Sequence, residues 1–491
     1  MSKGVRSNFY ADIMSQNQEV TGSCHLVVVK LPNGETLRIM VDCGLFQEKE
    51  HYDDNQKLIC NPENLDYVLV THNHIDHTGR LPLLIKKGYA GDFYTTHITK
   101  NLMPLALYDT CRILADLSKR KNIPSLYASK DVAQTINKTR GYDFNQKVRL
   151  SHNAAVTFFE NGHLIGAAMI LLQLSYPGYE DINLLFTGDY NNKNMFFNVE
   201  ELPLEVRKLP LTIIQEATYG YVNSTEMKAV FEENVAKAIA EKKTVIAPVF
   251  SLGRAQEILY VLKKMQQDGR LSTSIPIYFD GKLAFKYTGF YLSYAAELKL
   301  KVKEFLPDNL QTVDDAMRMS IIRDRGTKII VTTSGMGSYG PAQTYIPAYL
   351  PQKNALIHFT GYTAEGTLGR LLQTTETGST VEALGLILVK RADVQYTNEY
   401  SAHAKADEMI DFLKKFENIR MVLVNHGQAD VKEEFAKRIL SEVDTRNVGI
   451  QNHGHKIRIT KRKGAFLAPF RICKKSKQIF TKSIDKNYKK I

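Results

Sequence analysis

The chain has 491 residues, which is enough for two or three domains, and 44% of them are apolar and 24% charged, as in ordinary globular proteins. Its five cysteines are scattered and include no Cys-x-x-Cys pair, which excludes a disulfide framework and a thiolate zinc site and favours a reducing compartment. The N-terminus has no signal-peptide core, and no apolar run approaches the roughly 18 residues of a membrane-spanning helix. We therefore expect a soluble protein of the cytoplasm or nucleus, with no membrane partner.

The net charge of +12 is concentrated at the C-terminus. Residues 456–491 carry 13 lysines and arginines and one acid, Asp485, so the preceding 455 residues have no net charge. A basic segment of this kind attracts the phosphates of a nucleic acid. A solubilising tail has the same composition, and the sequence leaves both alternatives open for residues 461–491.

Residues 1–209 predict strands separated by short turns, with one helix near residues 101–120. Short apolar runs rich in β-branched residues are typical of buried strands. Five of these runs adjoin an acidic or histidine side chain that could bind a metal; the side chains are Asp42, the cluster that begins at His72, His163, Asp189 and His426. One aspartate after a strand is usually a turn or helix cap. Five such positions predict a single rim where strand ends meet.

The run Thr-His-Asn-His-Ile-Asp-His follows the predicted strand at residues 65–70. Alternate side chains of a strand point the same way, so His72 and His74 can converge on one ion, and the turn after them directs Asp76 and His77 to a second point. Imidazole and carboxylate suit zinc, with manganese or iron as competitors. A histidine-rich surface loop is the alternative, but the chain has only 13 histidines in 491 residues. The run therefore predicts metal binding.

From residue 210 to about residue 395 the pattern changes to alternating strands and helices. A strand at residues 244–250 precedes a helix at residues 254–268, which has apolar residues on one face. This alternation predicts a parallel, Rossmann-like sheet. Because strand ends of the metal-ligand type resume only at His403 and His426, the simplest interpretation is an α/β domain inserted into a metal-binding fold.

The turn between that strand and helix contains Ser251 and Arg254. Free N–H groups at a helix start favour a phosphate, and a guanidinium can add a bidentate contact. The turn lacks the Gly-Lys-Ser/Thr of a phosphate-binding loop, so it predicts nucleotide hydrolysis only weakly. Glycine-dependent turns are the alternative for this segment and for the glycine-rich segments at residues 333–337 and 361–370.

Taken in order, these motifs resemble those of the metallo-β-lactamase fold and, more specifically, of its β-CASP branch of nucleic-acid-processing nucleases. Three further segments are similar to motifs of that branch, and they contain Glu216, His403 and His426. The resemblance extends from residue 19 to about residue 430. It implies an αββα sandwich with an inserted Rossmann-like β-CASP domain. The expected parts are the metallo-β-lactamase domain at residues 1–209, the β-CASP domain at 210–395, the completion of the first domain at 396–460 and a basic tail at 461–491.

The resemblance also implies roles for the site residues. The expected ligands of two zinc ions per chain are His72, His74 and His163 for one ion and Asp76, His77 and His426 for the other, with Asp189 as the bridge. The ions would activate a water for attack on a phosphodiester. Asp76 is expected to be a catalytic residue as well as a ligand. Asp42 would orient a ligand imidazole through its second N–H. His403 would be the general acid, with Glu216 raising its pKa and fixing its tautomer.

RNA is the expected substrate, because the DNA-repair branch of these nucleases typically lacks a histidine at the position of His426. The motifs resemble those of prokaryotic relatives of the cleavage-and-polyadenylation endonuclease, which implies an endonuclease. A 5′–3′ exoribonuclease and a non-catalytic RNA-binding paralogue are the alternatives. The expected RNA contacts are Ser251, Arg254, Ser334 and Thr363. The oligomeric state stays open, with a homodimer as one alternative.

Overall fold

The computed structural model describes residues 9–460, apart from residues 18, 48, 227–229, 296–303, 362, 364, 365 and 398. The predicted basic tail at residues 461–491 lies outside the described residues. In the described part of the chain, no helix is long and apolar enough to span a membrane.

The first sheet of the described residues has seven strands in the order β22-β1-β2-β3-β4-β5-β6. The strands are β1 (Tyr10–Ser15), β2 (His25–Lys30), β3 (Thr36–Val41), β4 (Tyr67–Leu69), β5 (Phe93–Thr96), β6 (Thr139–Tyr142) and β22 (Lys456–Thr460). Alternate residues of β2 face opposite sides, since Val27 and Val29 enter the core between the sheets and Leu26 packs on the outer face.

The second sheet, also seven-stranded within the described residues, has the order β21-β20-β11-β10-β9-β8-β7. Its strands are β7 (Lys147–Arg149), β8 (Ala154–Glu160), β9 (Ala168–Leu174), β10 (Ile182–Phe186), β11 (Leu211–Glu216), β20 (Ile419–Asn425) and β21 (Val448–Ile450). β11 pairs in parallel with both β10 and β20, so it belongs to this sandwich. We therefore propose that the inserted domain begins after β11 rather than at residue 210.

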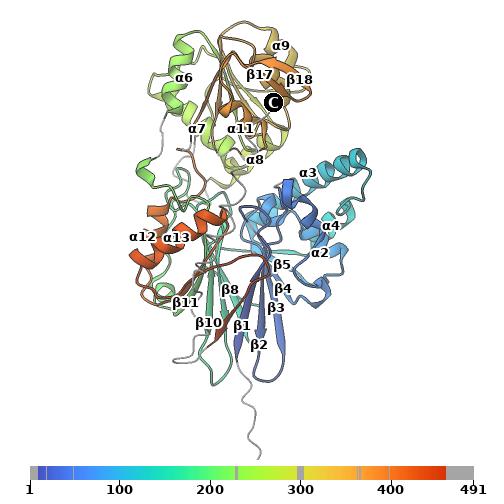
Figure 1. Ribbon diagram of the computed structural model, residues 1–491, viewed down its shortest axis with the longest axis vertical. Coiled ribbons are helices and arrows are strands. Elements are labelled where there is room, and N and C mark those ends of the chain that lie inside the picture. The colour runs from blue at the N-terminus through green and yellow to red at the C-terminus, as the bar shows by residue number, and fades with distance from the viewer. Residues whose placement is uncertain are drawn as a thin grey trace, which may run out of the picture.

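Helices cover the outer faces of the two sheets (Figure 1). On the first sheet these are α1 (Ile75–Thr78), α2 (Leu81–Lys86), α3 (His97–Lys121) and α4 (Ser129–Asn137), and beside the second they are α5 (Leu204–Arg207), α12 (Ala406–Leu413) and α13 (Ala429–Glu442). One apolar cluster lies between the sheets, and one lies beneath each helical layer. The expected αββα sandwich is confirmed.

The inserted domain contains a six-stranded sheet in the order β14-β13-β15-β12-β16-β19, in which every described pair is parallel. Its strands are β12 (Thr244–Pro248), β13 (Ile277–Asp280), β14 (Leu310–Thr312), β15 (Ile329–Thr332), β16 (Ala355–Phe359) and β19 (Asp393–Tyr396). Strands buried on both faces need apolar side chains on both, which explains runs such as Ile329–Thr332. The expected Rossmann-like domain is confirmed.

Helices flank both faces of this parallel sheet. They are α6 (Phe231–Ala240), α7 (Arg254–Gln267) and α8 (Lys282–Tyr294) with one apolar cluster, and α9 (Arg318–Arg323), α10 (Ala342–Tyr349) and α11 (Leu368–Thr374) with the other. A separate hairpin consists of β17 (Thr380–Ala383) and β18 (Leu386–Val389).

The two domains share an apolar junction. Ile98 and Leu102 of α3 and Phe196 of the sandwich pack in one cluster with Tyr287 and Tyr291 of α8. Figure 1 shows the inserted domain above the ends of the sandwich strands that carry the predicted site residues. A buried junction of this kind holds the inserted domain over those strand ends.

Candidate metal centre

The loop after β4 carries four of the predicted ligands. β4 ends at Leu69, so His72 and His74 lie beyond the strand, and His74 is the N-cap residue of the one-turn helix α1. Asp76 and His77 lie on that helix. The expected strand alternation is therefore not what brings the first two histidines together. The turn into α1 does so.

The segment after β3 holds this loop in place. The Cys43 N–H donates to the carbonyl of His77 at 2.8 Å. A Cβ atom at Gly44 would lie 1.5 Å from the carbonyl oxygen of Asp76, so this approach requires glycine. Arg80, which is fully buried, donates through Nε to the Gly44 carbonyl. The ligand loop is thus fixed by backbone contacts.

One group of potential ligands consists of His72, His74, His163 and Asp189, whose ligand atoms all lie within 4.8 Å of one another. His163 Nε2 lies 2.9 Å from His74 Nδ1 and 3.8 Å from Asp189 Oδ2, and His72 Nε2 lies 3.7 Å from the same oxygen. His163 Nδ1–H donates to the Ala402 carbonyl at 2.7 Å. That hydrogen bond leaves His163 Nε2 facing the other ligands.

A second group consists of Asp76, His77, Asp189 and His426, with its ligand atoms also within 4.8 Å. Asp189 Oδ2 lies 3.2 Å from His77 Nε2, and Asp189 Oδ1 lies 3.1 Å from His426 Nε2. Asp76 Oδ2 lies 3.8 Å from His77 Nε2. Asp189 is common to both groups, which is the arrangement that a bridging carboxylate requires.

Asp42 lies behind the second group. Its Oδ2 lies 2.8 Å from His77 Nδ1, and its Oδ1 accepts the Thr71 N–H at 2.8 Å. The Thr71 hydroxyl donates to Asp42 Oδ2 at 2.8 Å. With Nδ1 held by Asp42, His77 presents Nε2 to the centre, as expected for a carboxylate that orients a ligand imidazole.

Asp42 and His426 both adopt left-handed backbone conformations, with φ of 59° and 49°. Such a conformation costs an L-residue about 1–3 kcal/mol and persists only where the surroundings impose it. Each residue directly follows a sandwich strand, β3 or β20. The strained turns direct these two side chains into the rim instead of along the sheet.

The chemistry of this donor set fits metal ions. His72 Nε2, His77 Nε2, His426 Nε2 and Asp189 Oδ1 are buried without a hydrogen-bond partner among the described residues. Each such atom costs about 1–3 kcal/mol when nothing satisfies it. Burial holds the pKa of His72 well below its usual range, so its imidazole is neutral and has a lone pair for a ligand bond. A metal ion at each group would satisfy these atoms.

A third feature lies beside the first group. His403 Nδ1 lies 2.9 Å from Glu216 Oε2, and the other oxygen of Glu216 accepts the Tyr190 N–H at 2.8 Å. Burial lowers the pKa of His403, but the Glu216 carboxylate more than offsets this and the pKa is raised. The ring of His403 lies 4.8 Å from that of His163, measured between centroids. This histidine can hold a proton next to the ligand groups, although the ligand atoms of Glu216, His403 and Asp189 also lie close enough together to hold an ion.

Comparisons with known proteins agree with this geometry. The metallo-beta-lactamase superfamily matches residues 18–133, the Beta-Casp domain matches residues 255–372 and the Zn-dependent metallo-hydrolase RNA specificity domain matches residues 388–451. A protein named as a ribonuclease from Thermus thermophilus is 30% identical over 427 residues, which cover 84% of this chain and 92% of that protein. The chain belongs to the β-CASP family.

Other β-CASP relatives differ in their names. A transcription termination factor, FttA, from Methanosarcina mazei is 29% identical over 89% of this chain and 69% of its own length. Cleavage and polyadenylation specificity factor subunit 3-II from Arabidopsis thaliana is 27% identical over 88% of this chain and 70% of its own length. A crystal structure of a protein of unknown function from Enterococcus faecalis superposes with a TM-score of 0.53, at 13% identity over 92% of this chain and 100% of that one. That last likeness shows the fold alone.

The β-CASP family match supports the expected ribonuclease family, and its metallo-β-lactamase part implies divalent metal binding. The three matched regions divide the candidate site. Residues 18–133 contain the loop after β4, whereas residues 388–451 contain both His403 and His426. The rim is therefore assembled from both ends of the β-CASP chain, with the inserted domain between them in sequence.

Sequence reasoning missed the asparagines that support the site. Asn161 Nδ2 donates to the Asp189 carbonyl at 2.8 Å, and Asn191 Nδ2 donates to the Ser401 carbonyl at 2.7 Å. The Asn425 side chain accepts the His426 N–H at 2.6 Å. Each asparagine lies within two residues of a predicted ligand, and that spacing is the signal that could have found it.

The four expected RNA contacts lie in the β-CASP domain and differ in accessibility. Ser251 is half-buried, and Ser334 Oγ is buried without a hydrogen-bond partner among the described residues. Thr363 is buried and its hydroxyl donates to Gln373 at 3.1 Å. Arg254 is buried, and its Nη1 lies 2.9 Å from Glu257 Oε2. This ion pair involves Nη1, whereas Arg254 Nε is buried without a hydrogen-bond partner among the described residues, so the expected phosphate contact of Arg254 stays a prediction.

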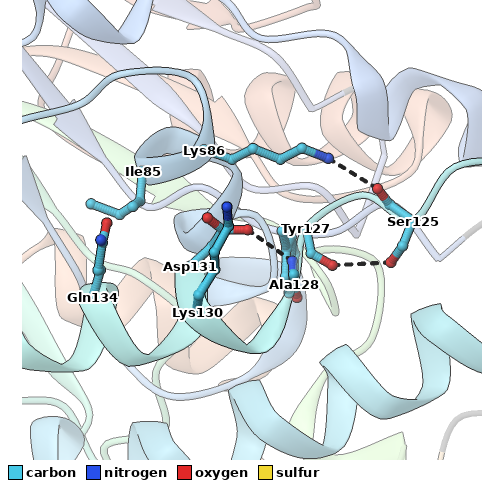
Figure 2. Close-up of a pocket in the computed structure, with 8 residues that line it drawn as sticks. All are labelled: Ile85, Lys86, Ser125, Tyr127, Ala128, Lys130, Asp131 and Gln134. Atoms are coloured by element: carbon cyan, nitrogen blue, oxygen red, sulfur yellow. Dashed lines mark hydrogen bonds between the residues drawn. The ribbon is translucent and has the colours of Figure 1, made fainter.

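A pocket of about 330 Å³ lies between α2 and α4, away from both ligand groups (Figure 2). Lys86 crosses it and donates to the carbonyls of Ser125 and Leu126 at 3.1 and 2.9 Å. Asp131 accepts the Ala128 N–H at 2.8 Å. Lys86 and Asp131 already have hydrogen-bond partners, so neither charged group is available to bind a ligand in this pocket.

Proposed function

We propose that this β-CASP protein is a zinc-dependent ribonuclease that hydrolyses RNA phosphodiester bonds internally, with two zinc ions per chain. One observation carries the proposal. Two groups of ligand atoms share Asp189, and the His403–Glu216 pair lies directly beside them. This combination supplies both charge stabilisation and a proton donor, which cleavage of a phosphodiester requires.

The proposed ligands divide as the two groups do. His72, His74 and His163 would hold one ion, Asp76, His77 and His426 the other, and Asp189 would bridge them. Bound zinc would activate a water and neutralise charge on the phosphate. Nitrogen and oxygen donors without cysteine suit zinc, with manganese and iron as competitors.

His403 handles the proton on the leaving oxygen. Its Nδ1–H is held by Glu216, so Nε2 is the nitrogen that can donate to a substrate. The raised pKa keeps the imidazole protonated more readily than a free histidine. Its position beside His163 places that proton next to the ligand groups. A general acid at this point would favour departure of the RNA oxygen.

The β-CASP domain would bind the RNA backbone over the rim. Ser251 is retained as a direct contact because its side chain is half-buried, whereas Ser334 Oγ is buried and Ser334 stays an expected contact only. We propose that Arg254 and Thr363 support these loops through their own partners, Glu257 and Gln373. The RNA would then lie between the two domains.

Two other functions compete with this one. A 5′–3′ exoribonuclease would use the same centre, because only the mode of RNA entry differs. A non-catalytic RNA-binding paralogue would have lost ligands, whereas every predicted ligand belongs to one of the two groups. We also propose a cytoplasmic location, given free Cys24, Cys43, Cys60 and Cys111 among the described residues, and keep a homodimer as an alternative to a monomer.

The test is to incubate the purified chain with RNA labelled at the 5′ end and, separately, at the 3′ end. An endonuclease yields end-labelled fragments of intermediate length from the start, whichever end carries the label. A 5′–3′ exonuclease releases the 5′ label as a mononucleotide and shortens the 3′-labelled chain progressively. No cleavage by protein that contains two zinc ions would overturn the proposed activity.

The basic tail would add long-range attraction for RNA. A chain that ends at Thr460 should bind RNA more weakly at low salt and with a flatter salt dependence, by about one unit of slope per lost phosphate contact. Equal slopes for the two chains would identify the tail as a solubilising segment.

A further inference from the structure

Two tyrosines lead from the proposed general acid to the surface. The ring centroid of Tyr219 lies 6.0 Å from that of His403, and the ring of Tyr221 lies 6.4 Å further, inclined by 29° to that of Tyr219. Tyr219 is buried at 8% exposure, whereas Tyr221 is 53% exposed. The row of rings therefore ends in an aromatic face that is open to solvent.

The backbone around these rings is held on several sides. The Val222 N–H donates to the Tyr219 carbonyl at 3.1 Å, and the Val222 carbonyl accepts the Ala406 N–H at 2.9 Å. A Cβ atom at Gly220 would lie 2.9 Å from Phe435 Cβ, so glycine permits this turn to pack on α13. Lys405 Nζ lies 4.6 Å from the ring centroid of Tyr219. Tyr221 is thus presented on a fixed turn.

Charged groups near Tyr221 come from both domains. Burial raises the pKa of its phenol, the positive charge of Arg370 lowers it and Asp430 raises it. Arg370 lies on α11 of the β-CASP domain, and Asp430 lies in the first turn of α13. Charges of both domains therefore act on this ring.

We propose that the exposed ring of Tyr221 is a stacking platform for one unpaired nucleobase of the RNA substrate. A base inside a duplex has both faces covered, so only a single-stranded base can lie on this ring. Stacking on one aromatic ring tolerates different bases, because every base has a π-face. This subsite rests on the proposed ribonuclease function. It makes the chain selective for single-stranded RNA at a set distance from the cut bond.

The absence of tryptophan from the sequence gives a direct test. In a His403→Ala background, which keeps the RNA intact, Tyr221→Trp introduces a single indole at the subsite. Titration with a ten-nucleotide single-stranded RNA should quench its fluorescence as the RNA binds. Tyr179→Trp is the matched control, because Tyr179 is 42% exposed and lies in the turn between β9 and β10, at the end of β10 remote from Asp189. The proposal would be overturned if fluorescence anisotropy shows that the Tyr221→Trp variant binds the RNA while its indole fluorescence is not quenched.

A second measurement removes the ring. Tyr221→Leu should weaken RNA binding by about five- to a hundred-fold, whereas Tyr221→Phe, which keeps the ring, should change it little. A set of RNAs, each with one abasic site at a different position, should include one RNA that binds the Phe variant clearly more weakly than the others. The Leu variant should bind all RNAs of the set equally. An identical abasic profile for both variants would refute the subsite. Failure of the wild-type chain to cut RNA would refute the ribonuclease function instead, because these binding experiments require no cleavage.

Discussion

The protein has two rims of strand ends, one in each domain, and they differ in the chemistry of their side chains. Around β4, β10, β11 and β20 the sandwich presents histidines and carboxylates, several of which are buried without a hydrogen-bond partner among the described residues. Around β12 and β15 the inserted domain presents serine, glycine and Arg254, and the arginine is already paired with Glu257. Both rims contain buried atoms without a hydrogen-bond partner among the described residues, but only those of the first rim belong to groups of ligand atoms within 4.8 Å of one another.

This difference shows how two stacked domains can divide one task. Buried unsatisfied donors and acceptors are costly, so a group of them made of ligand-type atoms within 4.8 Å of one another indicates a bound ion. The opposite rim can serve a mobile, charged polymer with hydroxyl and backbone groups, which bind phosphates without fixing a sequence. Substitutions in the first rim should therefore affect chemistry, and those in the second should affect stability and binding.

The largest effect is expected from His74→Ala. Its Nδ1 faces His163 Nε2, so its loss opens the first ligand group. Cleavage should fall by more than the roughly 10²–10⁴-fold that a lost general acid costs, and elemental analysis should find less than the proposed two zinc ions per chain. His152→Ala, an exposed histidine between β7 and β8, is the matched control. Full zinc content in the His74 variant would exclude it as a ligand.

His403→Ala should reduce cleavage by about 10²–10⁴-fold, because it removes the proton donor. Both zinc ions should remain, since its partner is Glu216 and neither ligand group includes it. Comparing the metal content of this variant with that of the His74 variant separates the two roles. Loss of zinc here would mean that His403, Glu216 and Asp189 hold an ion themselves.

A smaller effect is expected from Asp42→Asn, which weakens the orientation of His77. Loss of such a partner typically costs about 10–100-fold in metal affinity. Activity should be recovered as zinc is added in titrations, unlike that of the His403 variant. The control is Asp66→Asn, because exposed Asp66 accepts the Arg38 N–H at 2.7 Å and lies at the end of β4 opposite the ligand loop. An unchanged zinc affinity would assign Asp42 a purely structural role.

The second rim should respond in stability more than in activity. Arg254→Met leaves Glu257 buried without its ion-pair partner, which should cost about 3–5 kcal/mol in the free energy of unfolding. Arg254→Met combined with Glu257→Leu should recover most of that loss in denaturant unfolding. RNA affinity of the double variant should then match the wild type. A clear loss of affinity in the stable double variant would restore Arg254 as a direct phosphate contact.

Local features explain how much of this could be predicted from the sequence. The run from His72 to His77 is compact, and the strands before Asp189 and His426 are apolar and short, so residue type and spacing alone indicate a rim of ligands. The alternation after residue 244 predicts the parallel sheet for the same reason. The ends of elements are harder to predict: α12 begins only at Ala406, where the Glu408 side chain accepts the Lys405 N–H.

Contacts between distant segments were decided only by the tertiary structure. The sequence by itself determined the ligand types, their approximate spacing and the two-domain pattern, because these depend on neighbours along the chain. The pairing of β11 with β20 and the approach of Asp42 to His77 depend on how the sandwich folds, whereas Arg254 and Glu257 lie one turn apart on α7 and only their burial depends on tertiary packing. The role proposed for the exposed ring of Tyr221 also depends on the tertiary structure, since only folding brings the ring of Tyr219 next to that of His403.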